Sequence, residues 1–158
     1  MTETTDTRKR KGKLIFLVAI VAVCAAVYMY QRKDLTIPGW RSNFDVALAE
    51  ARKEGKMMVV LFTAQPPGEI ARAIAVRVNM PANRDALFGK DGKSGRYIPA
   101  CVSVSKSSPL VRKYDITQLP ALMVLYPDGS VRNRHDGEIG EVPFRVEFLE
   151  YKESGSKK

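Results

Sequence analysis

The sequence contains little cysteine, histidine or tryptophan. Its 158 residues include two cysteines, Cys24 and Cys101, with one histidine and one tryptophan. Two cysteines do not make a disulfide framework, and Cys24 lies in an apolar segment where it cannot easily meet Cys101. One histidine and one distant cysteine also lack the spacing of metal ligands. We therefore expect no intramolecular disulfide, no metal site and no cofactor.

A stripe of basic residues interleaved with aromatic ones is also absent. The formal net charge is +9, but residues 1–33 hold seven Lys or Arg against two acidic residues. Just over half of the basic excess therefore flanks the apolar segment, and the rest of the chain is only mildly basic. Proteins that bind nucleic acids usually concentrate positive charge on one face. We expect no nucleic-acid partner.

Charge is missing altogether from residues 14–30, which begin at Leu14 and end at Tyr30. As a helix this segment would span about 26 Å, close to the thickness of a bilayer's hydrocarbon core. Five basic residues lie between positions 8 and 13, and the more basic flank of a membrane helix stays in the cytoplasm. We expect a cytoplasmic tail over 1–13, a transmembrane helix over 14–30 and a linker over 31–39.

Two other interpretations of this segment remain open. It could be a cleaved signal peptide, because the small residues Ala22, Ala25 and Ala26 offer a weak cleavage site after a charged start. It could also carry a lipid on Cys24, although Val23 is a poor fit to the small residue expected before it. All three interpretations place the later residues outside the cytoplasm.

The rest of the chain alternates between helical and strand patterns. Apolar residues fall on one face of a predicted helix over 44–54, and an unbroken apolar run predicts a central strand over 57–62. Pro67 suits the first position of a helix that reaches about residue 78. Further along we expect a short helix over 82–88, a strand over 97–104, a helix over 109–114, a β-hairpin of 121–126 and 131–134, and a last helix over 142–152. This order predicts an α/β domain over 40–152, with a mixed central sheet, helices on both faces and a loose tail over 153–158.

Three stretches of this domain resemble the thioredoxin superfamily. They are residues 49–56 leading into the VVLFTA strand, residues 113–121, and residues 124–129. The chain is similar to the periplasmic thioredoxin-like domain of bacterial thiol:disulfide interchange proteins. The resemblance implies a thioredoxin-like fold, a location at the bacterial inner membrane and a domain on its outer side. It also implies that Pro120 is the family's cis-proline, with the Leu119 backbone beside the turn at Pro67 and Gly68, where the family pairs with an extended substrate peptide.

The chain departs from the family at the catalytic motif. Aligning Phe62-Thr63-Ala64 with the end of the family's strand puts the family's CxxC motif at Pro67-Gly68-Glu69-Ile70. Thiol exchange needs a thiolate at a helix N-terminus, and neither Pro67 nor Ile70 supplies one. The family's catalytic residues therefore have no counterpart here, and we expect no oxidoreductase activity from this motif.

Two single residues could still carry chemistry. Cys101 lies in the apolar run IPACVSV, where a small buried side chain is expected and a reactive thiol is the alternative. His135 follows the predicted hairpin, where we expect an exposed loop histidine because no nucleophile has the arrangement that a base needs.

The leading hypothesis is a membrane-anchored, redox-inactive domain that serves as a protein-binding or assembly module. Its expected contact residues are Pro67, Gly68, Leu119, Pro120 and Ala121. The first alternative is a thiol-dependent redox protein that uses Cys101 or a partner's cysteine. The second is a structural subunit of a membrane complex, held mainly by the helix over 14–30.

Overall fold

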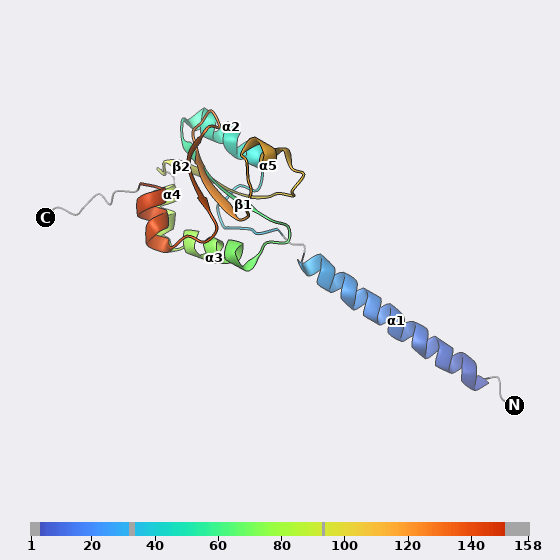
Figure 1. Ribbon diagram of the computed structural model, residues 1–158. Coiled ribbons are helices and arrows are strands. Elements are labelled where there is room, and N and C mark those ends of the chain that lie inside the picture. Colours follow the sequence, from blue (N-terminus) through green and yellow to red (C-terminus); the bar gives the residue numbers. More distant parts are fainter. Residues whose placement is uncertain (1–3, 32–33, 93, 151–158) are drawn as a thin grey trace. The chain divides into compact units, whose positions relative to one another are not determined.

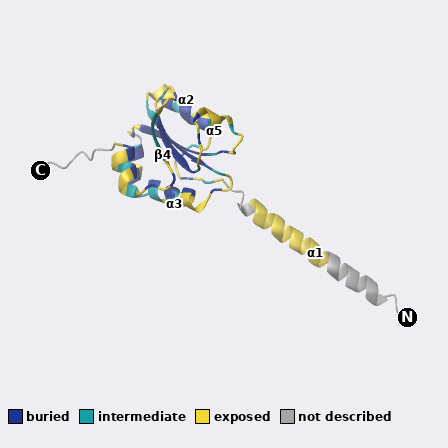
Figure 2. Ribbon diagram, in the orientation of Figure 1, coloured by how far each residue is buried: buried dark blue, intermediate teal, exposed yellow. Residues whose placement is uncertain are grey.

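The computed structural model describes residues 4–31, 34–92 and 94–150 (Figure 1). The chain divides into two compact units, with the boundary between residues 33 and 34. The first contains helix α1, Thr4–Gln31, whose side chains over residues 15–29 are exposed (Figure 2). Among the described residues, no helix is both long enough and apolar enough to span a bilayer. The predictions for residues 32–33 and for the tail beyond residue 150 lie outside the described residues.

The second unit is built around a four-stranded mixed sheet. Its strands are β1 (Met57–Thr63), β2 (Tyr97–Ser103), β3 (Ala121–Leu125) and β4 (Val131–Asp136), in the order β2-β1-β3-β4. β1 runs parallel to β2 and antiparallel to β3, and β3 runs antiparallel to β4. β1 and β3 are buried almost throughout, as expected for the central strands of a sheet covered on both faces.

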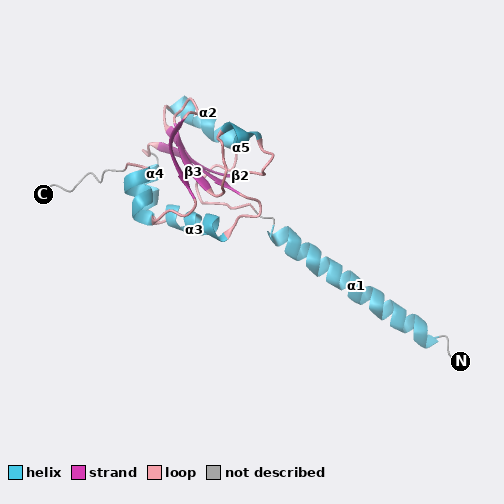
Figure 3. Cartoon of the chain, viewed as in Figure 1, coloured by secondary structure: helices cyan, strands magenta, loops and turns pink. Residues whose placement is uncertain are grey.

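Helices cover both faces of this sheet, as predicted (Figure 3). The helices of the domain are α2 (Phe44–Glu54), α3 (Glu69–Val78), α4 (Pro81–Phe88), α5 (Pro109–Lys113) and the C-terminal η1 (Pro143–Phe148). Side chains of α2 pack in one core cluster with Met58, Val60 and Phe62 of β1. Side chains of α3, α4 and η1 pack in a second cluster with Val59 and Leu61, which alternate to the other face.

Three sequence-based expectations about these elements were wrong. Helix α3 begins at Glu69, and Gly68 precedes it in an extended conformation, so Pro67 lies outside the helix. The last helix ends at Phe148 instead of residue 152, because Glu150 has a left-handed φ of 50° that α-helical backbone cannot adopt. His135 lies in β4, opposite Leu122, because the strand runs two residues further than the sequence pattern predicts.

Candidate functional site

Two short segments lie at the same end of the sheet. Phe62, near the end of β1, is paired with Ala121 at the start of β3. The turn that leaves β1 and the loop that enters β3 must therefore emerge side by side. We call residues 66–68 and 119–121 together the proline edge. All five predicted contact residues belong to it.

The first half of the proline edge is an open turn. Pro67 is buried, whereas Gly68 is exposed and adopts φ −73° and ψ 173°. A Cβ atom added at Gly68 would meet no other atom within 4 Å, so the surface in front of it is empty. Ile70, in the first turn of α3, is 43% exposed. The turn thus presents a backbone and an apolar side chain at the positions that the resemblance aligns with the family's thiol motif.

The second half contains one residue, Leu119, whose backbone groups have no hydrogen-bond partner among the described residues. The peptide bonds of Gln65–Pro66 and Leu119–Pro120 are both cis, the latter as the resemblance implies. The Pro120 carbonyl accepts a hydrogen bond of 2.9 Å from the N–H of Gly137. Within the described part of the chain, neither the N–H nor the carbonyl of Leu119 has a hydrogen-bond partner. A strand-like segment of another molecule could use both groups.

Exposure divides the predicted contact residues into two kinds. Gly68 is exposed and Leu119 is half-buried, so both reach the surface. Pro67, Pro120 and Ala121 are buried, so their side chains shape the edge from below. The sequence alone did not separate these two kinds, because proline and alanine occur at both exposed and buried positions.

Cys101 is a poor candidate for a reactive thiol. Its side chain in β2 is 5% exposed and packs in the same cluster as Trp40 and Ile37. Burial, with a smaller contribution from the charge of Asp34, raises the pKa of the Cys101 thiol to about 12. The expected buried, hydrophobic role of Cys101 fits this environment. Both cysteines of the chain are free.

His135 is also committed to a local structural contact. Its Nε2 atom lies 2.8 Å from the carbonyl oxygen of Glu138, which follows β4 in the chain. The described residues contain no group of three or more His, Cys, Asp or Glu side chains arranged to hold a metal ion.

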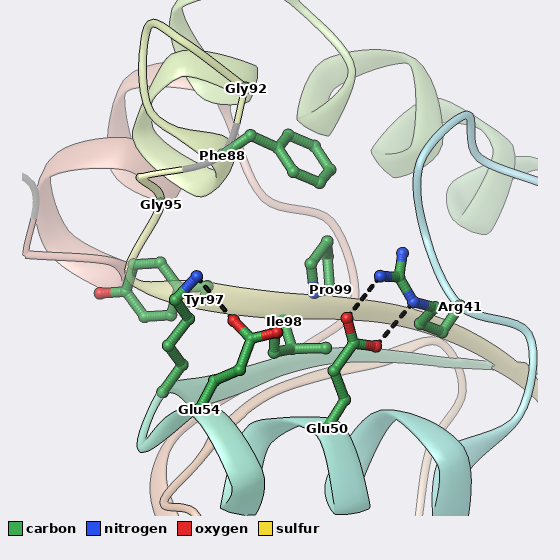
Figure 4. Close-up of a pocket in the computed structure, with 10 residues that line it drawn as sticks. Arg41, Glu50, Glu54, Phe88, Gly92, Gly95, Tyr97, Ile98 and Pro99 are labelled. Carbon is green, nitrogen blue, oxygen red and sulfur yellow. Dashed lines mark hydrogen bonds and ion pairs between the residues drawn. The ribbon is translucent and has the colours of Figure 1, made fainter.

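A cavity of about 290 Å³ lies beside the edge strand β2, and the sequence analysis did not find it (Figure 4). Arg41 donates to both carboxylate oxygens of Glu50, at 2.8 and 2.6 Å, and Lys56 lies 2.8 Å from Glu54. The hydrogen bonds that Arg41 donates to Glu50 raise the pKa of Arg41, and the hydrogen bond that Lys56 donates to Glu54 lowers the pKa of Glu54. Each of these charges already has a partner of opposite sign, so the described residues that line the cavity offer no unpaired charge to a ligand.

Comparison with solved structures identifies the fold. A thioredoxin from Thermus thermophilus is 21% identical, with a TM-score of 0.54 over 71% of this chain and 85% of its own. Trxlp from Edwardsiella tarda EIB202 is 16% identical, with a TM-score of 0.51 over 69% of this chain and 96% of its own. No protein-family model and no curated protein sequence matches the chain. The domain therefore has a thioredoxin-like fold.

Proposed function

We propose that this chain is a membrane-anchored, redox-inactive thioredoxin-like domain that binds a protein partner through the proline edge. The observation that carries this proposal is the Leu119 backbone, whose N–H and carbonyl have no partner among the described residues, beside an open turn without a thiol. The domain acts as a docking or assembly module on the outer side of a bacterial inner membrane. The domain binds its partner through hydrogen bonds and a complementary surface shape, and it transfers no electrons.

The partner that suits this surface is an extended, apolar polypeptide segment. Its backbone would pair with the N–H and carbonyl of Leu119, as an added strand pairs with a sheet edge. The turn after β1 and the start of α3 expose the side chains of Pro66 and Ile70, which favour an apolar side chain in the partner. Backbone pairing supplies affinity, and the apolar surroundings supply the preference among sequences.

The membrane anchor in this proposal is the apolar segment 14–30. Large apolar side chains of α1 are exposed along the helix, with Phe16 at 69%, Leu17 at 62% and Met29 at 73%. A contiguous apolar surface of this kind is unfavourable in water and needs a cover. We propose that lipid covers it, with the basic residues before it in the cytoplasm. Alkaline carbonate extraction of membranes containing the full chain tests this step, because release into the soluble fraction would contradict it.

Site-specific photo-crosslinking in cells tests the docking surface. A benzoylphenylalanine in place of Leu119 should form protein adducts on irradiation of the full-length chain. The same group in place of Tyr126 is the matched control, because Tyr126 is 44% exposed and directly follows β3, at the opposite end of that strand. Adducts at position 119 and not at position 126 support the proposal. Absence of adducts at position 119, or equal yields at both positions, would contradict it.

A substitution tests the same surface without a crosslinker. Leu119→Arg places a charged, long side chain on the apolar edge and should abolish the adducts that a benzoylphenylalanine at position 70 forms. Tyr126→Arg adds the same charge at the opposite end of β3 and should leave those adducts unchanged. Adducts that survive Leu119→Arg unchanged would mean that the partner does not contact the proline edge.

A further inference from the structure

One side chain of β4 ties down the loop that leads to the proline edge. The Nη1 atom of Arg134 donates to the carbonyl oxygens of Tyr114 and Asp115, at 3.1 and 2.9 Å. Its Nε atom donates to both carboxylate oxygens of Asp136 at 3.0 Å, which holds the guanidinium in place. The two carbonyls follow the end of α5, where the last carbonyls of a helix have no partner within the helix. Arg134 is their only hydrogen-bond donor among the described residues.

The other end of the same loop is fastened to the same strand. The N–H of Gly137, directly after β4, donates to the Pro120 carbonyl at 2.9 Å, and Asp136 is paired with Ala121 in the sheet. Residues 114–120 therefore form a loop whose two ends are both held by residues 134–137. Between these ends, the backbone groups of Thr117, Gln118 and Leu119 have no hydrogen-bond partner among the described residues, and Leu119 is the one of the three that belongs to the proline edge.

The Arg134 contacts set the direction of the chain where it turns. Asp115 has a left-handed φ of 47°, so the chain reverses there before it runs towards Leu119. Arg134 holds the carbonyls on both sides of that reversal. A planar guanidinium can donate to several acceptors at fixed angles, which an ammonium group does not do. Loss of the hydrogen bonds from Arg134 to these two carbonyls would therefore allow the peptide groups that precede Leu119 to rotate.

We propose that Arg134 is a positioning residue for the proline edge, acting on the partner through the placement of the Leu119 backbone. The role of Arg134 is indirect in this proposal, since its Nε and Nη1 atoms already donate to a carboxylate and to two carbonyls of the same chain. This inference rests on the proposed docking function, but the effect of Arg134 on the loop does not.

The rest of the loop's anchoring allows a clean test. The Tyr114 hydroxyl donates to the Gly129 carbonyl at 3.1 Å, and its ring packs against Phe44 and Phe62. These contacts keep α5 on the sheet when Arg134 is replaced. Arg132 provides a matched control on the same strand, because its side chain is 26% exposed against 28% for Arg134 and it also forms an ion pair, with Glu150. The contacts of Arg132 with Met57 and Glu150 do not involve the loop.

The experiment compares Arg134→Met, Arg134→Lys and Arg132→Met in the full-length chain. The first readout is amide hydrogen exchange over residues 114–116, whose N–H groups donate to carbonyls of α5, with β1 as the internal reference. The second is the yield of photo-adducts from benzoylphenylalanine at position 119. We expect Arg134→Met to speed exchange over 114–116 and to lower adduct yield, each by about tenfold. Arg134→Lys should produce a smaller change in the same direction, and Arg132→Met should change neither readout.

The outcomes separate this inference from the proposed function. Unchanged exchange over 114–116 in both Arg134 variants would overturn the positioning role, as would faster exchange with unchanged adduct yield. If Arg134→Met fails to fold, Arg134→Lys decides by the same two readouts. If the unsubstituted chain forms no adducts at position 119, the docking function fails. In that case the exchange rates alone decide whether Arg134 orders the loop.

Discussion

The N–H of Gly137 donates a hydrogen bond of 2.9 Å to the carbonyl of Pro120 and so joins the end of β4 to the start of β3. Gly137 is buried and has a left-handed φ of 85°. Gly68, on the other half of the proline edge, has an ordinary φ of −73°. A Cβ atom at either position would meet no atom within 4 Å. The two glycines therefore differ in backbone conformation and not in available space.

Alanine substitutions at these glycines should have different effects on stability. Gly137→Ala should lower the free energy of unfolding by about 1 kcal/mol, because an L-residue is disfavoured at positive φ. Gly68→Ala should instead raise it by about 0.5 kcal/mol, since its backbone conformation suits any residue and alanine restricts the unfolded chain. Urea unfolding of the two variants in parallel measures the difference. Equal midpoints would show that the conformation at residue 137 is not strongly favoured by glycine.

The ion pair between Arg41 and Glu50 should contribute to the attachment of the segment before α2. Arg41 also exchanges two backbone hydrogen bonds with β2, at 2.9 Å to Pro99 and 2.8 Å from Cys101. Glu50→Gln should lower the free energy of unfolding by up to about 1 kcal/mol, because the bidentate pair is partly exposed and screened by solvent. The loss should shrink as salt is added.

Glu54→Gln is the matched control for this prediction. Glu54 lies one turn further along α2, and its ion pair with Lys56 is closer to solvent, with 40% of the Glu54 side chain exposed against 26% for Glu50. Its effect on the urea midpoint should be smaller than that of Glu50→Gln. A larger effect would show that the pair at Lys56, and not the pair at Arg41, holds this side of the domain.

The buried thiol of Cys101 should make stability depend on pH in the alkaline range. Its pKa rises from a reference value of 9.0 to about 12 in the folded domain, chiefly through burial. Above pH 9 the unfolded chain loses this proton and the folded chain keeps it, so the contribution present below pH 9 disappears as the pH approaches 12. Between pH 9 and pH 11, the free energy of unfolding of the unsubstituted domain should fall by about 1 kcal/mol for each pH unit. This fall is in addition to the change that the Cys101→Ala variant shows over the same range.

Thiol alkylation at neutral pH provides an independent readout of the same environment. In a Cys24→Ala background, Cys101 should react with iodoacetamide far more slowly in the native domain than in urea, because the reactive thiolate is both scarce and shielded. Fast labelling of native Cys101 would instead favour the alternative hypothesis of a thiol-dependent redox protein.

Local structure in this domain was largely predictable from the sequence. The helix over 44–54 was predicted with the bounds that the structure has, because its apolar spacing is clear and Gly55 ends it at φ 62°. The strand over 57–62 was one residue short of β1. Such features depend on residues that are close together in the chain, so a single sequence contains the information. The resemblance to thioredoxins likewise depended on short, contiguous stretches.

Contacts between distant segments were not predictable in this way. Trp40 and Phe44 are close in the sequence, but their side chains belong to core clusters on opposite faces of the sheet. Nothing in the sequence links Arg134 to Tyr114, because their contact depends on how β3 and β4 pair and on where α5 ends.

The sequence by itself determined which segments become helices and strands, and that no thiol pair stands at the turn after β1. Only the tertiary structure decided which residues of the proline edge reach the surface, because exposure depends on neighbours from other elements. The same holds for Cys101, whose raised pKa results from the Ile37–Trp40 segment and β2 packing together around it. Periodicity is a property of the chain, whereas burial and electrostatic environment belong to the assembled fold.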